Sequence, residues 1–524
     1  MGRKINMKKL TALLLALTLL MTCFAVSTCA VAEEAYKDII NIADNDQGAS
    51  YDLHKDTSVN VRNMLRGTVF EQLVTLKKSG EIAPELCESY DVNENSSEFV
   101  FHLRKGVKFH NGKEMTSADV VASLNRWLEC FSTARKMVGE ARFQADDEYT
   151  VSLKLANSAN MLLDMLAGAS QAAVIYPEES IAAVDETTGF IPVSAFIGTG
   201  PYMFTEWAVD QYIQLDRFDD YAPYGDPDQE LDGLWGYKHA YTKTLKYWIV
   251  KDAATRFNGL MTGEYDFVVK LTDDYVPVLE GNGDYTVYSQ QTGMINLVWN
   301  KRSTDKWLRL AFQAAANADD LNTVNYGSLY DNDPCFMEDA QPGWYTTAGG
   351  EYFCQNDIEK AKELLAQSSY DVSKPVRILV SKGGHAEDML LVLEQQVAPL
   401  GITFELNIVD RSTLTELRKD DSCYDAYFTT FSSVPVPSLR NFLDASYAGW
   451  SEDEHLQELM LAMTTAPSKD EAFKVWEQVQ EYCYADYCPI LMMGHFHQAA
   501  ACTSKLTGYN VFLTTNFWNA RLAK

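Results

Sequence analysis

The stretch FVFHLRKGVKFHNGKEMTSADVVASLNRW, from Phe99 to Trp127, joins two elements of different periodicity. Between positions 99 and 103, large apolar residues alternate with other residues, which is the period of a half-buried strand. Asn111-Gly112 is a turn signal because both residues tolerate positive φ, and Thr116 with Asp119 is close to a capping box. The apolar residues that follow at helical spacing are Val120, Val121, Leu124 and Trp127. The stretch therefore predicts a strand, a turn and an amphipathic helix of an α/β protein.

Length and charge limit the class of protein. The chain has 524 residues, enough for two or three domains with well-filled cores. Its formal net charge is −29, and such a surface repels phosphate backbones, so we expect no nucleic-acid partner. The 28 Tyr, 24 Phe and 10 Trp must mostly form cores, while a minority can line a cleft.

Residues 1–32 have the pattern of a secretory signal peptide. Four basic residues precede an apolar run from Leu10 to about Val26, and Ala30-Val31-Ala32 matches a small-x-small cleavage site. Cleavage after Ala32 would lower the net charge from −29 to −33, because the segment has four basic and no acidic residues. The alternatives are a transmembrane anchor or a lipid anchor at Cys23, but the Thr before Cys23 fits a lipobox poorly. We expect a secreted, extracytoplasmic protein, in the periplasm or on the outer face of the cytoplasmic membrane.

The sequence shows no signature of an enzyme. It contains no HExxH, GxSxG, Walker A or GxGxxG motif, so we expect no catalytic residues and no cofactor. The ten cysteines form no CxxC, and we expect free thiols, although Cys483/Cys488 and Cys335/Cys354 are alternatives for disulfides. His495-x-His497 would place two imidazoles on one face of a strand, but no third ligand is visible, so we expect no metal site.

The opening stretch also resembles a family signature. The pattern F-x-L-R-x-G-V-K-F-H-x-G, followed by D-V-x-x-S-x-x-R, is similar to that of family 5 solute-binding proteins, the extracytoplasmic receptors of peptide, nickel and related ABC importers. Further matching segments are SYDLHKD from Ser50, GTGPY from Gly198 and WLRLAFQAAANADDL from Trp307. GTGPY lacks GK[ST] and a following helix, so it reads as a structural turn rather than a phosphate cradle. The resemblance extends from about Asp38 to Leu522.

The resemblance implies a two-lobed periplasmic-binding-protein-like α/β fold of type II, in its large variant. Lobe I would comprise 33–269, with an extra subdomain at about 81–195. Lobe II would comprise 270–488, and 489–524 would return to lobe I. The β-α-β pattern of VRILVS, DMLLVLEQQVAPLG and ITFELNIVD independently predicts a parallel sheet in lobe II.

The resemblance also places a ligand between the lobes. In peptide-binding members the ligand backbone is held as an added strand, and the matching positions here are Asp56, Thr57, Ser58, Phe431, Ser432 and Ser433. Such members pair an aspartate with the ligand's α-amino group, and some use an arginine. The aligned positions here hold Val434 and Phe428, so both charge anchors are absent. An unpaired buried ammonium is costly, which favours an uncharged or weakly charged ligand.

Three further residues are candidates for ligand contacts. Lys382 and His385 lie between a strand and a helix, where family members place carboxylate-contacting residues; the alternative is a solvated turn. Trp299 is a candidate stacking platform, as is Trp450, but each fits a core position equally well.

These features together indicate a substrate-binding protein of an ABC importer, which captures a peptide or peptide-like solute and delivers it to the membrane permease. The alternatives are a non-peptide ligand such as a sugar-like compound or a metal chelate, a chemosensory receptor, and, least favoured, a secreted α/β hydrolase. We expect the protein to be a monomer.

Overall fold

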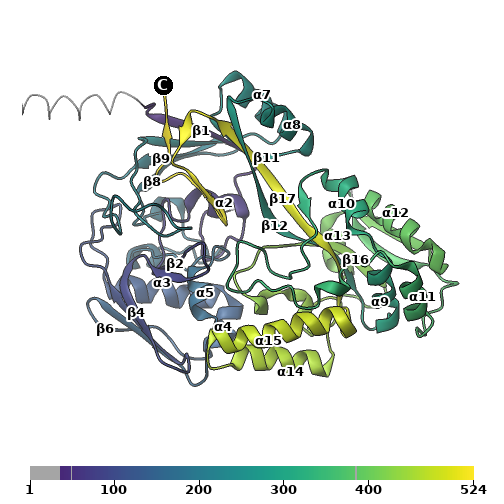
Figure 1. Ribbon diagram of the computed structural model, residues 1–524. Helices are drawn as coiled ribbons and strands as arrows, with labels where there is room; N and C mark the ends of the chain where they lie inside the picture. The colour runs from purple at the N-terminus through teal and green to yellow at the C-terminus, as the bar shows by residue number, and fades with distance from the viewer. Residues whose placement is uncertain (1–35, 49, 384–385) are drawn as a thin grey trace, which may run out of the picture.

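Two long antiparallel strands form the axis of the molecule: β12 (Tyr285–Trp299) and β17 (Ile490–Thr503). They pair from Tyr285↔Thr503 to Val298↔Ile490, so each strand extends from one α/β lobe into the other. Figure 1 shows this computed structural model, which describes residues 36–48, 50–383 and 386–524. The predicted signal peptide and Cys23 lie outside the described residues.

The main sheet has 11 strands in the order β15-β14-β16-β12-β17-β11-β1-β10-β9-β8, with β13 paired to β17. One end of this sheet, with β8 to β11 and β1, belongs to lobe I, and the other end, with β14 to β16, belongs to lobe II. Figure 1 labels β1, β8, β9 and β11 at the first end and β16 at the second. The other strands of this sheet are β1 (Ile39–Asp44), β8 (Tyr202–Ala208), β9 (Tyr212–Arg217), β10 (Thr244–Ile249), β11 (Phe267–Leu271), β13 (Tyr330–Asp331), β14 (Val376–Ser381), β15 (Phe404–Val409) and β16 (Ala426–Ser432).

Helices cover the sheet in both lobes, and three small two-stranded sheets complete lobe I. The helices are α2 (Val59–Leu65), α3 (Ser117–Cys130), α4 (Ser132–Val138), α5 (Leu162–Ala167), α6 (Glu178–Ala182), α7 (Ala253–Thr262), α8 (Val276–Glu280), α9 (Lys306–Ala315), α10 (Ala318–Tyr326), α11 (Ile358–Leu365), α12 (Ala386–Val397), α13 (Arg411–Leu417), α14 (Glu454–Thr465) and α15 (Lys469–Tyr482). The small sheets are β2 (Val74–Leu76) with β3 (Ile82–Pro84), β18 (Leu506–Thr507) with β21 (Arg521–Leu522), and β19 (Asn510–Phe512) with β20 (Thr514–Asn516).

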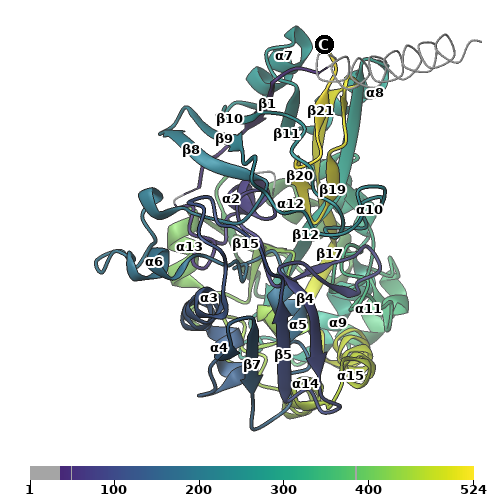
Figure 2. The same cartoon turned by 90° about the vertical axis from the view of Figure 1, so that its left-hand side faces the viewer.

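The stretch Phe99–Trp127 folds as its pattern predicts. It provides β5 (Glu98–Leu103), a turn with Gly112 at φ 85°, and α3. The carboxylate of Asp119 accepts the Thr116 N–H at 3.0 Å, which completes the predicted cap. β5 is central to a separate sheet in the order β4 (Cys87–Val92), β5, β7 (Thr150–Lys154) and β6 (Gln144–Asp147). Figure 2 shows this sheet beside α3 and α4, within the range predicted for the extra subdomain.

A buried ion pair connects two of the segments that match the family signature. Arg126 on α3 donates to both carboxylate oxygens of Asp52 in the SYDLHKD segment, at 3.0 and 2.5 Å. Asp52 also accepts the backbone N–H of Ile191 at 3.1 Å. Because the two charges form two direct hydrogen bonds, the cost of their burial is offset, and the pair fixes α3 against the segment that leads to α2.

The GTGPY segment is a structural turn, as predicted. Gly198 N–H donates to Nδ1 of His110 at 3.2 Å, and the other ring nitrogen of His110 lies 3.0 Å from the Gly200 carbonyl oxygen. A Cβ at Gly198 would collide with the carbonyl oxygen of Val69, and one at Gly200 with that of Thr68. Both glycines are therefore required by close backbone approach.

Lobe II contains the predicted β-α-β unit. β14 and β15 pair in parallel from Val376↔Phe404 to Ser381↔Val409, and α12 connects them. The domain boundaries remain a prediction: position 269 lies within β11, and position 489 directly precedes β17.

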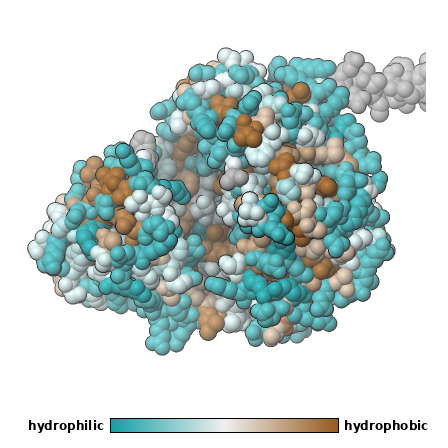
Figure 3. All heavy atoms as spheres, turned by 180° about the vertical axis from the view of Figure 1, so that it is seen from behind, coloured by the Kyte–Doolittle hydropathy of each residue, from teal (hydrophilic) through white to brown (hydrophobic). Residues whose placement is uncertain are grey.

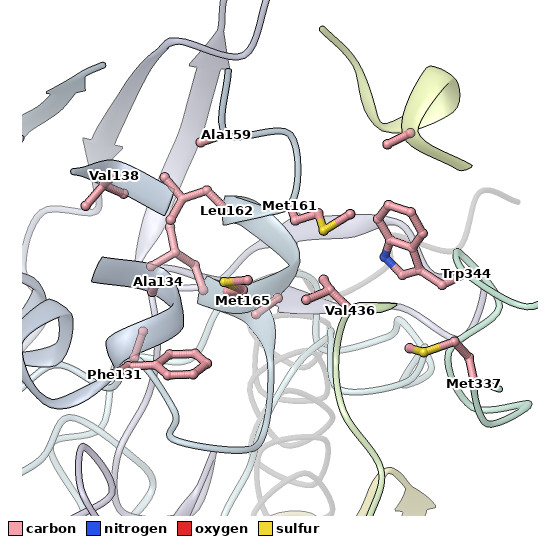
Figure 4. Close-up of a cluster of buried hydrophobic side chains, with 14 of the residues drawn as sticks. Phe131, Ala134, Val138, Ala159, Met161, Leu162, Met165, Met337, Trp344 and Val436 are labelled. Atoms are coloured by element: carbon pink, nitrogen blue, oxygen red, sulfur yellow. The ribbon is translucent and has the colours of Figure 1, made fainter. Parts of the chain in front are cut away.

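Apolar side chains from both lobes form one cluster below the crossing strands. Figure 4 shows Met161 and Met165, at α5 of lobe I, beside Trp344 and Val436. Polar contacts reinforce this junction: Asp164 accepts the Trp344 indole N–H at 3.2 Å and the Lys469 ammonium at 2.6 Å. The lobes are thus in contact through side chains as well as through the crossing strands.

Candidate functional site

Two predicted segments face each other between the lobes. They line a hollow of about 250 Å³, here called the edge hollow because it lies at the end of β16. Its lining residues are Thr57, Arg62, Ser170, Thr430, Phe431, Ser432, Ser433, Val434, Leu439, Arg440 and Asn441. The structure therefore brings together five of the predicted contact residues, one from lobe I and four from lobe II. Figure 3, seen from behind, shows the surface hollowed between the two masses.

Asp56 and Ser58 shape the lobe I wall and do not line the hollow. The Asp56 carboxylate accepts the backbone N–H of Ser50 at 3.1 Å and that of Ser58 at 2.7 Å. These bonds turn the loop between them and leave Thr57 exposed at its tip. In this structure Asp56 and Ser58 therefore position Thr57.

A second hollow, of about 60 Å³, lies between α2 and the crossing strands and is here called the crossing hollow. Its lining residues are Val59, Arg62, Asn63, Val269, Lys270, Tyr288, Gln290, Gln291, Thr292, Ala340, Ser433, Gln498, Ala499, Ala500, Val511, Leu513 and Thr515. Arg62 and Ser433 line both hollows. Each hollow is smaller than the roughly 300 Å³ at which ligand sites usually begin, so a ligand would extend across Arg62 and Ser433.

The charged residues that line the two hollows are all cationic: Arg62, Lys270 and Arg440. Arg440 donates to Glu338 at 2.8 Å and to the Ser432 carbonyl oxygen at 3.1 Å. Lys270 donates to Asn60 Oδ1 at 2.7 Å. On a chain with net charge −29, this local sign is opposite to that of the whole molecule.

Sequence reasoning missed Arg62, Lys270 and Arg440. One sequence feature could have pointed to Arg62: it is the single charged residue of the helix VNVRNML. It follows Val59 by three residues, so the two side chains lie on the same face of the helix. Lys270 and Arg440 gave no periodic signal, because they lie at the end of a strand and in a loop.

The other predicted contact residues lie elsewhere. Trp299 is 0% exposed and packs edge-to-face on Phe312 in the lobe II core, so the core interpretation is correct and the stacking platform is not. Lys382 is exposed and lines neither hollow. His385 lies outside the described residues. Phe428, aligned with the family arginine, packs in the lobe II core.

The two histidines of His495-x-His497 have separate partners. His495 Nε2 lies 2.8 Å from the Cys335 carbonyl oxygen, and His497 Nε2 lies 2.6 Å from Asp331. Across 36–48, 50–383 and 386–524, no group of three or more potential side-chain ligands is arranged to hold a metal. The eight cysteines in these ranges, Cys483 and Cys488 among them, are free thiols.

The sheet leaves an edge open beside the edge hollow. On one side, β16 pairs with β12 from Ala426 to Ser432. On the other side β14 pairs with it at Ala426 and Tyr427, and no strand in the described part of the chain continues this pairing. Beyond Tyr427 the outer edge of β16 therefore has no strand partner in the described ranges, and an added strand could pair there as far as the Ser432 carbonyl oxygen, which already accepts from Arg440.

The model for bacterial extracellular solute-binding proteins, family 5, matches residues 81–452, and the chain belongs to this family. A probable peptide ABC transporter periplasmic-binding protein of Sinorhizobium fredii is 23% identical over 494 residues, covering 87% of this chain and 88% of that protein. The oligopeptide-binding protein AppA of Bacillus subtilis is also 23% identical, over 506 residues, with coverage of 88% and 87%.

Solved structures share the fold. AgaA of Agrobacterium tumefaciens, in complex with agropinic acid, has a TM-score of 0.71 and 22% identity, covering 93% of this chain and 99% of AgaA. DppA of Helicobacter pylori, in complex with the peptide STSA, has a TM-score of 0.71 and 20% identity, covering 94% of this chain and all of DppA. The predicted two-lobed α/β fold of periplasmic binding proteins is thereby confirmed. Within the described ranges no helix has the length and apolar character to cross a membrane.

Proposed function

We propose that this family 5 binding protein captures a peptide or peptide-like solute between its lobes and delivers it to an ABC permease. The observation that carries the proposal is the open edge of β16, which ends in the edge hollow opposite Thr57. An extended backbone can add to such an edge through main-chain hydrogen bonds, while the hollow receives a side chain. The names of the two peptide-binding relatives support the same ligand class.

The test is calorimetry with pools of short N-acetylated peptides, accompanied by mass spectrometry of whatever co-purifies. Thr57→Trp fills the edge hollow from the lobe I side, so we expect it to abolish binding. The matched control is Thr262→Trp, at the exposed end of α7. Equal binding by both variants would place the ligand elsewhere.

A non-peptide ligand is the second candidate. The cationic lining of both hollows and the absence of an amine-binding aspartate favour it, and the structural neighbour AgaA was solved with agropinic acid. Mass spectrometry of the co-purified compound distinguishes the two classes directly.

Secretion and a monomeric state are part of the proposal. The basic and apolar pattern of residues 1–32 supports removal after Ala32 and release outside the cytoplasm. N-terminal sequencing of the native protein should begin at Glu33, whereas a blocked, lipidated Cys23 would contradict cleavage. Light scattering should give the mass of a single chain.

A further inference from the structure

Arg62 is a buried cation whose side chain forms no hydrogen bond or ion pair with any described residue of the chain. Its relative exposure is 6%, and its Nε is buried without a hydrogen-bond acceptor. Across the described part of the chain, its guanidinium forms no hydrogen bond or ion pair, although the side chain lines both hollows. A buried charge is normally paired, because transfer from water to the interior is costly.

The nearby acid Glu338 does not satisfy Arg62. One oxygen of Glu338 accepts from Arg440 at 2.8 Å, and both of these side chains are 1% exposed. The other oxygen, Oε1, is buried and has no hydrogen-bond donor. Glu338 lines neither hollow, and among the described residues no Asp or Glu lines the space beside Arg62.

The charge of Arg62 persists at working pH. Burial lowers its pKa to about 10, with the carboxylate of Glu338 opposing the shift, so the side chain is a guanidinium at neutral pH. A guanidinium offers a planar array of N–H donors that matches a carboxylate in two parallel hydrogen bonds. Lys270 lines the crossing hollow and Arg440 lines the edge hollow, so each hollow contains one further cationic side chain besides Arg62.

We propose that Arg62 is the anion-binding residue of the inter-lobe site and that the ligand is a small solute with a carboxylate group. This inference rests on the proposed function and assigns a chemical class to its ligand. It replaces the expectation of an uncharged or weakly charged ligand, which was based on the missing aspartate and arginine. Arg62 links the edge hollow to the crossing hollow, so a carboxylate bound there would leave the rest of the ligand free to follow β16.

The test compares matched acids and amides. The probes are a pool of N-acetylated tripeptides with free C-terminal carboxylates, the same pool as C-terminal amides, and the non-peptide acids succinate and citrate. Calorimetry is performed on the wild type, Arg62→Gln, Arg62→Lys and the control Arg411→Gln, whose exposed arginine lies on α13. We expect the acids to bind the wild type about tenfold to a hundredfold more tightly than the amides.

Arg62→Gln should remove this preference while leaving amide binding unchanged, Arg62→Lys should restore part of it, and the control should retain it. The ligand-free Arg62→Gln variant should melt at the same or a higher temperature, because it loses an unpaired buried charge. A lower melting temperature would instead assign Arg62 a structural role and contradict the proposal.

The remaining outcomes separate the two proposals. If acids and amides bind equally, or if Arg62→Gln keeps the preference, the role of Arg62 is refuted while peptide binding stands. If only succinate or citrate binds, and Arg62→Gln loses it, the role of Arg62 stands and the peptide proposal fails. If only the amides bind, the role of Arg62 is refuted and peptide binding stands. If no probe binds, both are refuted.

Discussion

Val434 lies in the edge hollow, at the position that the family resemblance aligns with an amine-binding aspartate. We expect Val434→Asp to improve binding of peptides with a free α-amino group by about tenfold to a hundredfold, because a charge-assisted hydrogen bond contributes about 1.5–3 kcal/mol. Calorimetry with free and N-acetylated forms of one peptide measures the change.

The neutral variant Val434→Asn is the control, since it matches the aspartate in size but has no charge. The same preference in both variants would show that the charge at position 434 is not the cause. Asp410 and Asp425 do not take the place of the missing amine-binding aspartate, because both already have partners. Asp410 caps α13, and Asp425 pairs with Arg377 at 2.8 Å.

The Asp52–Arg126 pair should determine much of the acid sensitivity of lobe I. Burial opposes ionisation of Asp52, but hydrogen bonds from Arg126 hold its pKa below the usual value. The pair therefore stabilises the fold above about pH 4, the unfolded value, and this contribution is lost as the pH falls below it. We expect Asp52→Asn to lower the free energy of unfolding by about 3–5 kcal/mol at pH 7, because Arg126 is left buried without a charge partner.

Urea denaturation at pH 7 and at pH 3 measures both effects. The control is Asp421→Asn, which removes an acid from a solvent-exposed pair with Arg302 and should change the midpoint little. Equal shifts for the two variants would contradict the assigned role of burial.

At the scale of elements, the Gly198 turn is held by backbone contact with Val69. We expect Gly198→Ala to destabilise the protein by about 1–3 kcal/mol, the usual cost of forcing extra atoms into a packed site. Gly283→Ala is the matched control, because a Cβ there meets no atom within 4 Å. Thermal unfolding of both variants measures the difference. Similar melting temperatures would show that the backbone at position 198 accommodates a Cβ without loss of stability.

The crossing strands contain an arrangement that no sequence motif revealed. Ser289 Oγ lies 2.9 Å from His497 Nδ1, and His497 Nε2 lies 2.6 Å from Asp331. Although burial opposes it, hydrogen bonds from His497 and Gln291 hold the pKa of Asp331 at about 2. These bonds connect β12, β17 and β13, and we interpret them as a structural tie between the three strands.

We therefore expect the pure protein to show no turnover of p-nitrophenyl acetate above buffer. Ser289→Ala should leave this baseline unchanged while lowering thermal stability slightly. Hydrolysis by the wild type that disappears in Ser289→Ala would instead identify a nucleophile.

At the scale of the whole molecule, ligand should draw the two lobes together. The lobes are connected by β12 and β17 and also touch through the apolar contact of Trp344 with α5. Small-angle scattering should give a smaller radius of gyration with bound ligand than after the ligand is stripped. An unchanged radius at saturation would contradict hinge closure.

A paired variant tests the apolar contact itself. Trp344→Ala removes one of its side chains, so the ligand-free radius should increase. Leu461→Ala, at a side chain that is 64% exposed on α14, should leave the radius as in the wild type.

Local pattern was sufficient for much of the fold. The strand at 99–103 and the cap formed by Asp119 depend on side-chain alternation and on a hydrogen bond that spans three residues. Those interactions act over short sequence distances, so the sequence displays them directly. The two-lobed fold followed from the resemblance that these same segments carry.

The site depended on tertiary structure. The resemblance predicted Thr57 and Val434 as positions of ligand contact, and the structure shows that both line the edge hollow. The proposed role of Arg62 depends on its guanidinium having no partner among the described residues, since Glu338 is already paired with Arg440. Burial and pairing of a charge are set by segments nearly 300 residues away in sequence, so no local pattern encodes them. The sequence by itself thus predicted a two-lobed fold and the loops that face each other between the lobes. The packing of the lobes decided that the charged residues lining the two hollows are the cations Arg62, Lys270 and Arg440.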